Sequence, residues 1–514
     1  MRRINLREDS YSNSPHEGGY AGARPHALVI PYPGQSHITP MMQLSKQLAV
    51  RGFEITFVNS GHNHKQLLDS QSAAAVPLPH QLGLDIWLVG LPDDDLPSEY
   101  FNNYEHVNEV YSNANGYLFR EKVVKVLEDN PTVTCIISHH YLSWGQEVAD
   151  KFGIPNVVYW SVMATLYCLY MQFPLLLEKG YLPLKCKKET LSGIRVPLVP
   201  DLEGLVPRFS LTDLPDFFQI EDISDPHYEF INRQRESLRQ AKWVLVNTFE
   251  SLETEAMEAL RARIPVYSVG PLLPSSLVGG HRFESLPDNR ACSALWPEEN
   301  QCLQWLDTQA PDSVIYISFG SFASLTDVQI QELAKGIEAS QQPFLWAVRP
   351  NAIKSGTISK IEGIESFVTR TKGRGMLVSW VPQPLVLQHP SVGGFLSHCG
   401  WNSTMEGISM GVPVLGCPLI AEQNTNAWFV EHHWKAGLSI KEGKIEANEV
   451  EKKIRSLMEE EGGGEVRRKC SEWKDKAREA LIQGGSSSTN LDAFVLEMHE
   501  VAAKRKPMRD QTRP

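Results

Sequence analysis

A short segment at 397–403, Ser-His-Cys-Gly-Trp-Asn-Ser, has the residue types and spacing of a phosphate-binding turn. It follows a predicted strand at 393–397 and precedes a helical pattern that begins at about Asn402. Glycine at such a turn lets backbone N–H groups face a ligand, and the positive end of the helix dipole attracts an anion there. With further donors from His398 and Ser403, the pattern predicts a diphosphate site that needs neither Lys nor Arg.

A structural alternative for the same residues is an ordinary helix cap. Asn402 or Ser403 could accept the first backbone N–H groups of the helix, and Glu406 would then complete a Ser-x-x-Glu capping box. Taken alone, these residues favour the cap over a ligand site, so the alternative stays open at this point.

Two further pairs carry side chains suited to parts of a nucleotide sugar. Trp380 and Gln383 lie at a predicted strand-to-loop turn beside a proline, where an indole can stack on a planar base and an amide can bond to it. Glu422 and Gln423 combine an acceptor with a donor and acceptor, which suits neighbouring sugar hydroxyls. Each pair also fits a plain structural interpretation, as a core indole and as a solvated loop.

The loop after the first predicted strand contains His37, which we interpret as a general base. This loop lies at the carboxyl edge of the sheet, where doubly wound folds place their ligands. An imidazole with an ordinary pKa near ~6.5 can remove a proton at neutral pH. Such a base can activate an acceptor hydroxyl for direct displacement, a reaction that requires no metal and no covalent intermediate.

The segment from Trp380 to Gln423 resembles the signature (PSPG) box of the plant family of inverting UDP-sugar glycosyltransferases. The resemblance extends from His26 to about Phe494 and includes Ser-Phe-Gly-Ser at 318–321 and Gly-Gly-Ser-Ser at 484–487. It implies the GT-B fold, an α/β architecture in which two doubly wound Rossmann-like domains face each other across a cleft. It also implies a transferase of plant secondary metabolism that uses a UDP-sugar as co-substrate, with no other cofactor.

The resemblance further implies roles for single residues. The expected UDP-binding set, in which Trp380 stacks on uracil and Glu406 binds the ribose hydroxyls, is Ser321, Trp380, Val381, Gln383, His398, Asn402, Ser403 and Glu406. The expected sugar-facing positions are Ser161, Trp401, Glu422 and Gln423. A terminal Gln such as Gln423 implies UDP-glucose as donor. The implied acceptor is a hydroxyl or carboxyl of a small apolar molecule such as a phenolic, flavonoid or terpenoid.

The chain departs from the family pattern at one catalytic position, where His139 replaces an expected Asp after the strand-like run 134–138. A neutral imidazole can hydrogen-bond to His37 and fix its tautomer, but it supplies no negative charge to a protonated partner. Three outcomes stay open: slow catalysis restricted to acidic phenols or carboxylates, compensation by another carboxylate, or UDP-sugar binding without activity. We expect His139→Asp to raise turnover on a weakly acidic alcohol.

The elements that must position these residues form two alternating strand and helix series. The first series has strand candidates at 26–30, 53–58, 84–89, 133–138, 155–160 and 242–247. The second has strand candidates at 313–319, 343–348, 375–379, 393–397 and 412–417, with helices over 326–340 and from about 402. Such alternation is typical of parallel sheets that have helices on both faces.

These series predict the domain organisation. We expect a disordered N-terminal extension at 1–24, an acceptor-binding domain at 25–272, a linker at 273–300, a UDP-sugar-binding domain at 301–483, a C-terminal helix at 484–505 and a polar tail at 506–514. The glycine- and serine-rich run 484–490 should break the chain before an amphipathic helix that packs on one of the lobes.

The composition indicates a globular protein without a nucleic-acid or membrane partner. The 514 residues include 49 Lys and Arg against 61 Asp and Glu, a net charge of −12, and no basic run is interleaved with aromatics. No stretch approaches the ~18 apolar residues of a membrane span. Eight scattered cysteines, none in a Cys-x-x-Cys pair, indicate reduced thiols, so we expect a soluble cytoplasmic protein.

Motifs typical of other functions are incomplete or absent in this sequence. The run 407–411 fits the Gly-x-Ser-x-Gly nucleophile elbow, but Ser409 would lie inside a helix and not directly after a strand. The close histidine pairs lack carboxylate or Cys partners at metal-ligand spacing, and no P-loop run occurs. The acceptor pocket should come from the first lobe, where either pocket lining or core packing explains Trp144, Tyr167, Tyr170 and Phe173.

Overall fold

The computed structural model describes residues 24–504 apart from 75–76, 94–116, 185–210, 275–276, 278–293, 297, 350–352, 354–357 and 441–444. The expected extension (except Arg24), most of the expected linker and the whole polar tail therefore lie outside the described residues.

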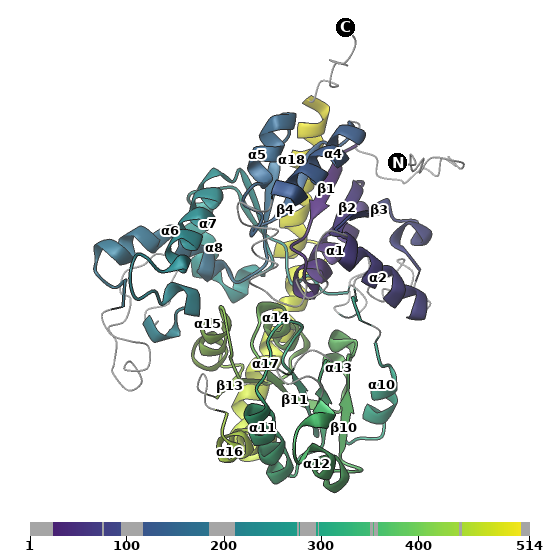
Figure 1. The fold of residues 1–514 in the computed structure, drawn as a ribbon, viewed down its shortest axis with the longest axis vertical. Coiled ribbons are helices and arrows are strands. Elements are labelled where there is room, and N and C mark those ends of the chain that lie inside the picture. Colours follow the sequence, from purple (N-terminus) through teal and green to yellow (C-terminus); the bar gives the residue numbers. More distant parts are fainter. Residues whose placement is uncertain are drawn as a thin grey trace.

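Two parallel sheets form the centres of two lobes (Figure 1). The first sheet has the strand order β3-β2-β1-β4-β5-β6-β7 and the second the order β10-β9-β8-β11-β12-β13. The first contains β1 (His26–Ile30), β2 (Glu54–Ser60), β3 (Ile86–Leu91), β4 (Cys135–His139), β5 (Asn156–Trp160), β6 (Trp243–Val246) and β7 (Val266–Ser268). The second contains β8 (Val314–Ser318), β9 (Phe344–Ala347), β10 (Gly375–Val378), β11 (Val392–Ser397), β12 (Val414–Gly416) and β13 (Gly437–Ser439).

The strands form where the sequence supplies short apolar runs that can be buried on both faces. All five residues of β1 and all five of β8 are buried, as a parallel sheet covered by helices requires. The predicted strands are thereby confirmed, with ends that differ by one or two residues. The edge strands β7 and β13 were not predicted, because three residues are too few to show a period.

Helices cover both faces of each sheet. Those between the strands of the first lobe are α1 (Gln35–Ala49), α2 (Gly61–Ala74), α4 (Tyr117–Asp129), α5 (Gly145–Phe152), α6 (Ala164–Glu178), α7 (Pro226–Gln240) and α8 (Thr254–Arg261). Those that follow the first lobe are α10 (Gln301–Leu306), α11 (Asp327–Ser340), α12 (Ile364–Arg370), α13 (Gln383–Gln388), α14 (Trp401–Met410), α15 (Gln423–Trp428), α16 (Ala447–Met458), α17 (Glu460–Leu481) and α18 (Ser486–Lys504). No helix in the described part of the chain is both long and apolar enough to span a bilayer.

The last helix returns to the first lobe, where α18 appears in yellow beside the first sheet (Figure 1). Phe494 and Met498 are buried in the same cluster as the first-lobe residues Phe53 and Phe57. This packing confirms the expected C-terminal amphipathic helix. Its start was misplaced, because α18 begins at Ser486 and the serine run that should break the chain forms its first turn.

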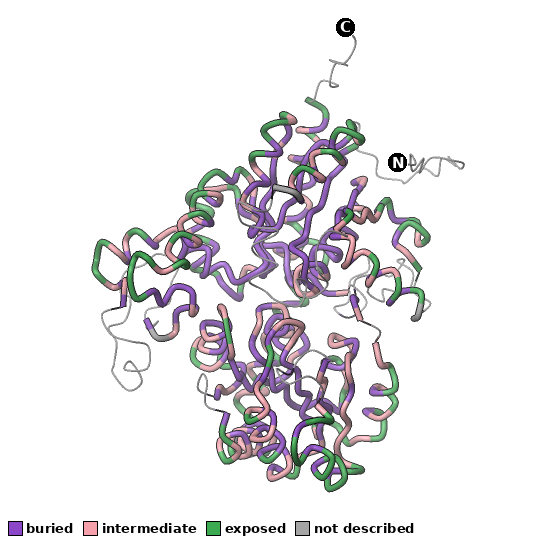
Figure 2. Tube along the Cα trace, in the orientation of Figure 1, coloured by how far each residue is buried: buried purple, intermediate pink, exposed green. Residues whose placement is uncertain are grey.

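Buried residues follow the two sheets and the region where the lobes meet (Figure 2). One hydrophobic cluster contains residues of both lobes, among them Trp160 and Phe249 of the first and Trp401 and Trp434 of the second. The indole N–H of Trp434 donates to the backbone oxygen of Leu252 at 3.0 Å. The lobes therefore share a packed interface in addition to their connecting chain.

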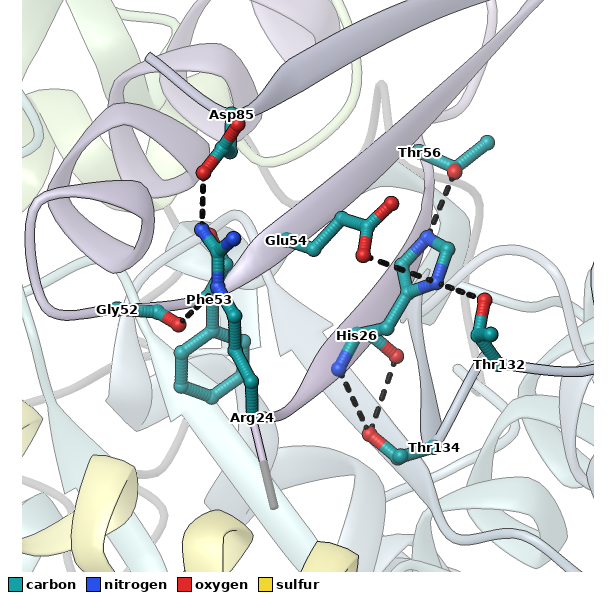
Figure 3. Close-up of polar contacts among 9 residues, drawn as sticks. All are labelled: Arg24, His26, Gly52, Phe53, Glu54, Thr56, Asp85, Thr132 and Thr134. Carbon is teal, nitrogen blue, oxygen red and sulfur yellow. Dashed lines mark hydrogen bonds and ion pairs between the residues drawn. The ribbon is translucent and has the colours of Figure 1, made fainter. Parts of the chain in front are cut away.

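Polar side chains fasten the amino end of β1 (Figure 3). The ring nitrogens of His26 bond to Thr132 at 2.9 Å and to Thr56 at 2.8 Å, which ties β1 to β2 and to the segment before β4. Arg24 donates to the backbone oxygens of Gly52 and Phe53, so Arg24 belongs to the folded lobe and not to a disordered extension as expected. These contacts fix the strand whose other end leads to the site.

Candidate active site

The strand orders place the functional side chains at two switch points. In the first sheet β1 lies between β2 and β4, and in the second β8 lies between β9 and β11. Connections from neighbouring strands leave in opposite directions at such a point, which opens a crevice at the carboxyl ends. His37 follows β1 and His139 ends β4, whereas the segment from His398 to Ser403 follows β11.

His37 lies in the first turn of α1 and not in the preceding loop as expected. The helix begins at Gln35 because Gly34 takes an extended conformation and serves as its N-cap. The His37 ring packs edge-on against His139, with 4.5 Å between centroids, and against Tyr32, at 5.2 Å. Its Nδ1 atom is buried and has no hydrogen-bond partner.

His139 does not hydrogen-bond to His37, which corrects the expectation that it could fix the His37 tautomer. Its Nδ1 accepts the backbone N–H of Tyr141 at 3.2 Å, so the proton of the neutral ring is on Nε2. Nε2 lies 2.9 Å from Oγ of Ser161 and donates to it. Both nitrogens of His139 are therefore engaged, and its contact with His37 is ring packing without a hydrogen bond.

Burial keeps these imidazoles neutral. It lowers the pKa of His37 to about 4 and the pKa values of His139 and His140 well below their ordinary range. His37 also lowers the pKa of His139 and of His140, and His140 lowers that of His139, since a charge on one ring disfavours a charge on the next. His37 is thus in its basic form at neutral pH, but nothing described beside it stabilises its protonated form.

The N-cap residue of α14 has no side chain that could cap the helix. The helix begins at Trp401, and its N-cap is Gly400, without a side-chain cap hydrogen bond. The alternative in which Asn402 or Ser403 caps this helix is therefore wrong, because both lie inside its first turn. Just before it, Cys399 has φ 59°, a strained left-handed conformation of the kind that clusters at functional sites.

Two glycines make room for His398 beside this mouth. A Cβ on Gly400 would lie 2.5 Å from Nε2 of His398, and one on Gly320, whose φ is +72°, would lie 2.5 Å from the same ring. The Nδ1 atom of His398 is buried and has no hydrogen-bond partner. Burial also lowers the pKa of His398 to about 4, so a neutral ring with an unused nitrogen faces the turn.

Asn402 connects the two lobes. Its amide N–H donates to the backbone oxygen of Ser36, next to His37, and its amide oxygen accepts from Asn247 at 3.4 Å. Ser36 has this acceptor to offer because the residue four positions later is Pro40, which has no N–H to bond to it within α1. The amide expected at the diphosphate thus spans the gap between the base and the helix mouth.

The expected base and ribose residues lie around the carboxyl ends of β8 and β10. The half-buried ring of Trp380 packs at 4.9 Å from Trp296, which comes from the expected linker region, while Val381 is buried. The Gln383 amide is not free for a base, because it donates to Ser403 and Glu406 and accepts from Tyr316 at 2.9 Å. Burial raises the pKa of Glu406 to about 7, and donation from Gln383 opposes that rise.

The expected sugar-facing residues also use some of their polar groups in hydrogen bonds within the protein. The Trp401 indole is buried and donates to the backbone oxygen of Asn247 at 2.7 Å. Gln423 uses its amide oxygen to accept two backbone N–H groups at 2.9 and 3.1 Å, which leaves its NH₂ group as the donor for a sugar. Burial raises the pKa of Glu422 to about 7, although the backbone N–H of Trp401 donates to its carboxylate. Ser161 is the acceptor of His139, and Ser321 lies half-buried after β8.

Sequence reasoning missed two residues of this site. Arg349 follows β9, and its guanidinium donates to the backbone oxygens of Gly320 and Ala323 at 3.3 and 2.6 Å. Burial lowers its pKa to about 10, so it stays charged at neutral pH beside the expected diphosphate. Asn247 follows β6 and contacts both Trp401 and Asn402. Both follow the carboxyl ends of parallel strands, which is the signal that could have found them.

Burial decides between the alternatives for Ser409 and for the expected acceptor lining. Ser409 is buried within α14, as expected, and so it cannot form a nucleophile elbow. Trp144, Tyr167, Tyr170 and Phe173 are at most 5% exposed, which favours core packing over pocket lining for these four. Among the described residues, no group of His, Cys, Asp or Glu is arranged to hold a metal ion.

Comparison with known proteins gives one consistent result. Residues 35–476 match the family described as UDP-glucoronosyl and UDP-glucosyl transferase. Linamarin synthase 1 of Manihot esculenta is 36% identical over 92% of this chain and 97% of its own length, and 7-deoxyloganetin glucosyltransferase of Gardenia jasminoides is 38% identical over 91% and 97%. Among solved structures, Os79 from O. sativa in complex with UDP superposes with a TM-score of 0.77 at 26% identity, covering 92% of this chain and 100% of Os79.

Proposed function

The chain belongs to the UDP-glucuronosyl and UDP-glucosyl transferase family, and from this premise we propose that it transfers glucose from UDP-glucose, with inversion, to a hydroxyl or carboxyl group of a small apolar acceptor. It is a glycosyltransferase with the GT-B fold, its donor is a UDP-sugar and its acceptor is a small molecule. Glucose as the sugar is supported by Gln423 and by the glucosyltransferase activity for which the Gardenia relative is named.

The observation that carries the proposal is the arrangement across the gap between the lobes. The mouth of α14 comes from one lobe and His37 from the other, and Asn402 bridges them by its bond to Ser36. An anion at that mouth would place a sugar on its diphosphate toward His37. No other cofactor is part of the proposal.

The proposed reaction needs one proton transfer and one displacement. His37 removes the proton of the acceptor as its oxygen bonds to the anomeric carbon. The bond from that carbon to the diphosphate oxygen breaks on the opposite face, and UDP leaves with the electron pair. The helix mouth and the Arg349 charge would stabilise the negative charge that develops on UDP.

We assign the donor contacts by position in the site. Trp380 and Val381 would bind uracil, with Trp296 supporting the indole, and Glu406 would accept the ribose hydroxyls. The diphosphate contacts proposed are the α14 N–H groups together with Ser321, His398, Asn402 and Ser403. The sugar contacts proposed are Ser161, Trp401, Glu422 and Gln423. For Gln383 the amide bonds to Ser403 and Glu406 favour a supporting role.

We also propose the domain limits and the compartment. The first lobe would bind the acceptor and the second the donor, within the limits expected from the sequence, except that α18 packs on the first lobe. The six described cysteines are buried thiols, which suits the reducing cytoplasm.

A second candidate function has one observation in its favour. Because His139 stands where the family pattern has Asp and is engaged with Tyr141 and Ser161, the chain could bind a UDP-sugar without turning over an acceptor. Such a protein would keep every donor contact and lack only the chemical step.

Consumption of UDP-glucose with a mixed panel of phenols, flavonoids and terpenoids separates the two functions. We expect acceptor-dependent release of UDP, lost by on the order of 10²–10⁴-fold in His37→Gln with UDP affinity unchanged in titration calorimetry. His62→Gln, a histidine on α2 of the same lobe, is the matched control and should keep its activity. Binding of UDP-glucose with no acceptor-dependent turnover would favour the non-catalytic function instead.

A further inference from the structure

The groups that face His37 are neutral rings. Tyr32, which follows β1, and His139 and Tyr141, at the end of β4, pack around its imidazole at centroid distances of 5.2, 4.5 and 6.1 Å. His140 stacks behind His139 at 4.4 Å. Among the described residues, no ion pair involves His37 and no carboxylate bonds to its buried Nδ1.

His139 is held where it cannot take over the role of a carboxylate. It is fully buried between the Tyr141 N–H, which donates to Nδ1, and Ser161, which accepts from Nε2. Turning the ring toward His37 would break both bonds and leave buried polar groups unpaired, which is unfavourable. The ring therefore stays a neutral neighbour throughout the reaction.

A proton taken up by His37 is consequently poorly stabilised. Burial already lowers the pKa of His37 to about 4, and a neighbouring carboxylate, which ordinarily raises such a pKa by roughly 1–3 units, is missing. A base this weak removes a proton efficiently only from an acid that releases it readily. The acceptor must then supply the acidity that the protein does not provide.

Aromatic side chains extend from the base along one direction. Beyond Tyr141 the rings of Phe230 and Phe217 follow at successive centroid distances of 6.0 and 6.1 Å. Phe230 is half-buried and so keeps some exposed surface. Aromatic faces and edges of this kind pack well against a flat aromatic ring.

We propose that the acceptor is an acidic phenol, whose hydroxyl ionises near neutral pH and whose ring packs along Tyr141 and Phe230. This inference rests on the proposed function and names its substrate class. The phenol loses its proton to His37 or to solvent, its oxygen bonds to the anomeric carbon, and the bond from that carbon to the diphosphate breaks as UDP leaves. The ionised fraction of the acceptor, and not that of His37, then sets the rate at neutral pH.

The test compares phenols of similar size and different acidity with UDP-glucose. We expect kcat/KM at pH 7 for 4-nitrophenol, which ionises near neutral pH, to exceed that for 4-methylphenol, which ionises at about pH 10 as tyrosine does, by on the order of 10²-fold. The rising limb of each pH profile should follow the pKa of the phenol. Equal rates for the two phenols, or one common limb for both, would overturn the proposal.

A variant pair tests the cause. His139→Asp should raise turnover of 4-methylphenol by on the order of 10–10²-fold and that of 4-nitrophenol by much less, because the carboxylate stabilises protonated His37. His139→Asn has nearly the same shape without the charge and should show no such gain. An equal gain in both variants would contradict the electrostatic cause.

Three results separate failure of this inference from failure of the proposed function. Efficient turnover of a neutral aliphatic alcohol, with phenols no better, would overturn the substrate class and keep the glucosyltransferase. Turnover of benzoate but of no phenol would do the same. Binding of UDP-glucose with no acceptor turned over would overturn both. The wild-type phenol series is decisive even if the position 139 variants fold poorly.

Discussion

The side chains of the proposed site carry little charge. Burial raises the pKa values of Glu406 and Glu422 to about 7, and it lowers those of His37 and His398 to about 4. Arg349 is charged throughout the neutral range. Because the two histidine rings are neutral, the positive end of α14 and the Arg349 charge are left to attract a diphosphate.

Glu406 gives a prediction for donor binding. Its pKa is raised, so it gains a proton as the pH falls below about 7, and a protonated carboxyl accepts ribose hydroxyls less well. We expect the affinity for UDP-glucose to fall by up to about tenfold per pH unit below pH 7 and to level off above it. Titration calorimetry from pH 5.5 to 8.5 measures this; UDP-glucose is the probe because its diphosphate is esterified at both ends and does not titrate there.

The control is Glu406→Gln, which keeps the bond partners of Gln383 but cannot ionise. Its affinity should be lower at pH 8 and independent of pH. A wild-type affinity that is flat across the same range would contradict a role for ionised Glu406 at the ribose.

At the scale of elements, two helix starts meet across the gap. The first turn of α1 carries His37, and the first turn of α14 carries the proposed anion site. Their contact depends on Pro40, because the proline leaves the Ser36 carbonyl unbonded within α1 and Asn402 donates to it instead. A residue with no polar side chain and no backbone N–H thus determines where a hydrogen bond between the lobes forms.

Pro40→Ala tests this dependence. The new N–H can bond to Ser36 within α1 and compete with Asn402, so we expect kcat to fall by on the order of tenfold while thermal stability is kept or raised. Pro174→Ala is the matched control, since Pro174 also lies inside a helix, α6. The double variant with Asn402→Ala should be non-additive. Additive losses in that cycle would rule out the proposed coupling.

Gly400→Ala tests the packing around His398. The added Cβ would lie 2.5 Å from the His398 ring while the φ of −60° suits alanine, so the ring must move and backbone strain is not the cause. We expect UDP affinity to fall at least about tenfold, or 1.4 kcal/mol, in calorimetry. Gly464→Ala, where the Cβ meets nothing within 4 Å, should bind UDP as the wild type does. Unchanged affinity in Gly400→Ala would show that His398 need not stay in place.

The sequence predicted the long, strongly patterned elements and missed what depends on contacts between the lobes. Strands such as β1 and β8 are apolar runs, and the α14 turn is marked by its own residues. The tautomer of His139 depends on a backbone N–H and on Ser161, 22 positions away, and no local pattern records such a pairing. The Trp296 contact with Trp380 is likewise hidden, because its partner comes from a segment that reads as linker.

At the scale of the whole molecule, the last helix closes the chain on its first lobe. Phe494 is fully buried, and its ring lies 6.5 Å from Phe53 and 6.0 Å from Tyr267. Glu497 accepts from Trp243 at 2.7 Å, and Arg51 pairs with Asp492 at 2.7 Å. The C-terminal residues therefore stabilise the lobe that carries His37.

Phe494→Ala should destabilise that lobe selectively. We expect a loss of about 3–5 kcal/mol in the free energy of unfolding and faster hydrogen exchange in β1 and β2 than in β8 and β11. Leu496→Ala, which changes a side chain that is 48% exposed on the same helix, should alter neither. Exchange that rises mainly in the second sheet would contradict the assignment of α18 to the first lobe.

The measurement that tests the central claim most directly is a crystal structure of the protein with UDP-glucose or an unreactive analogue. The account predicts the diphosphate within hydrogen-bond distance of the N–H groups in the first turn of α14, with the His37 ring directed at the anomeric carbon from the other lobe. A nucleotide bound away from that turn, or a sugar that His37 does not face, would contradict it.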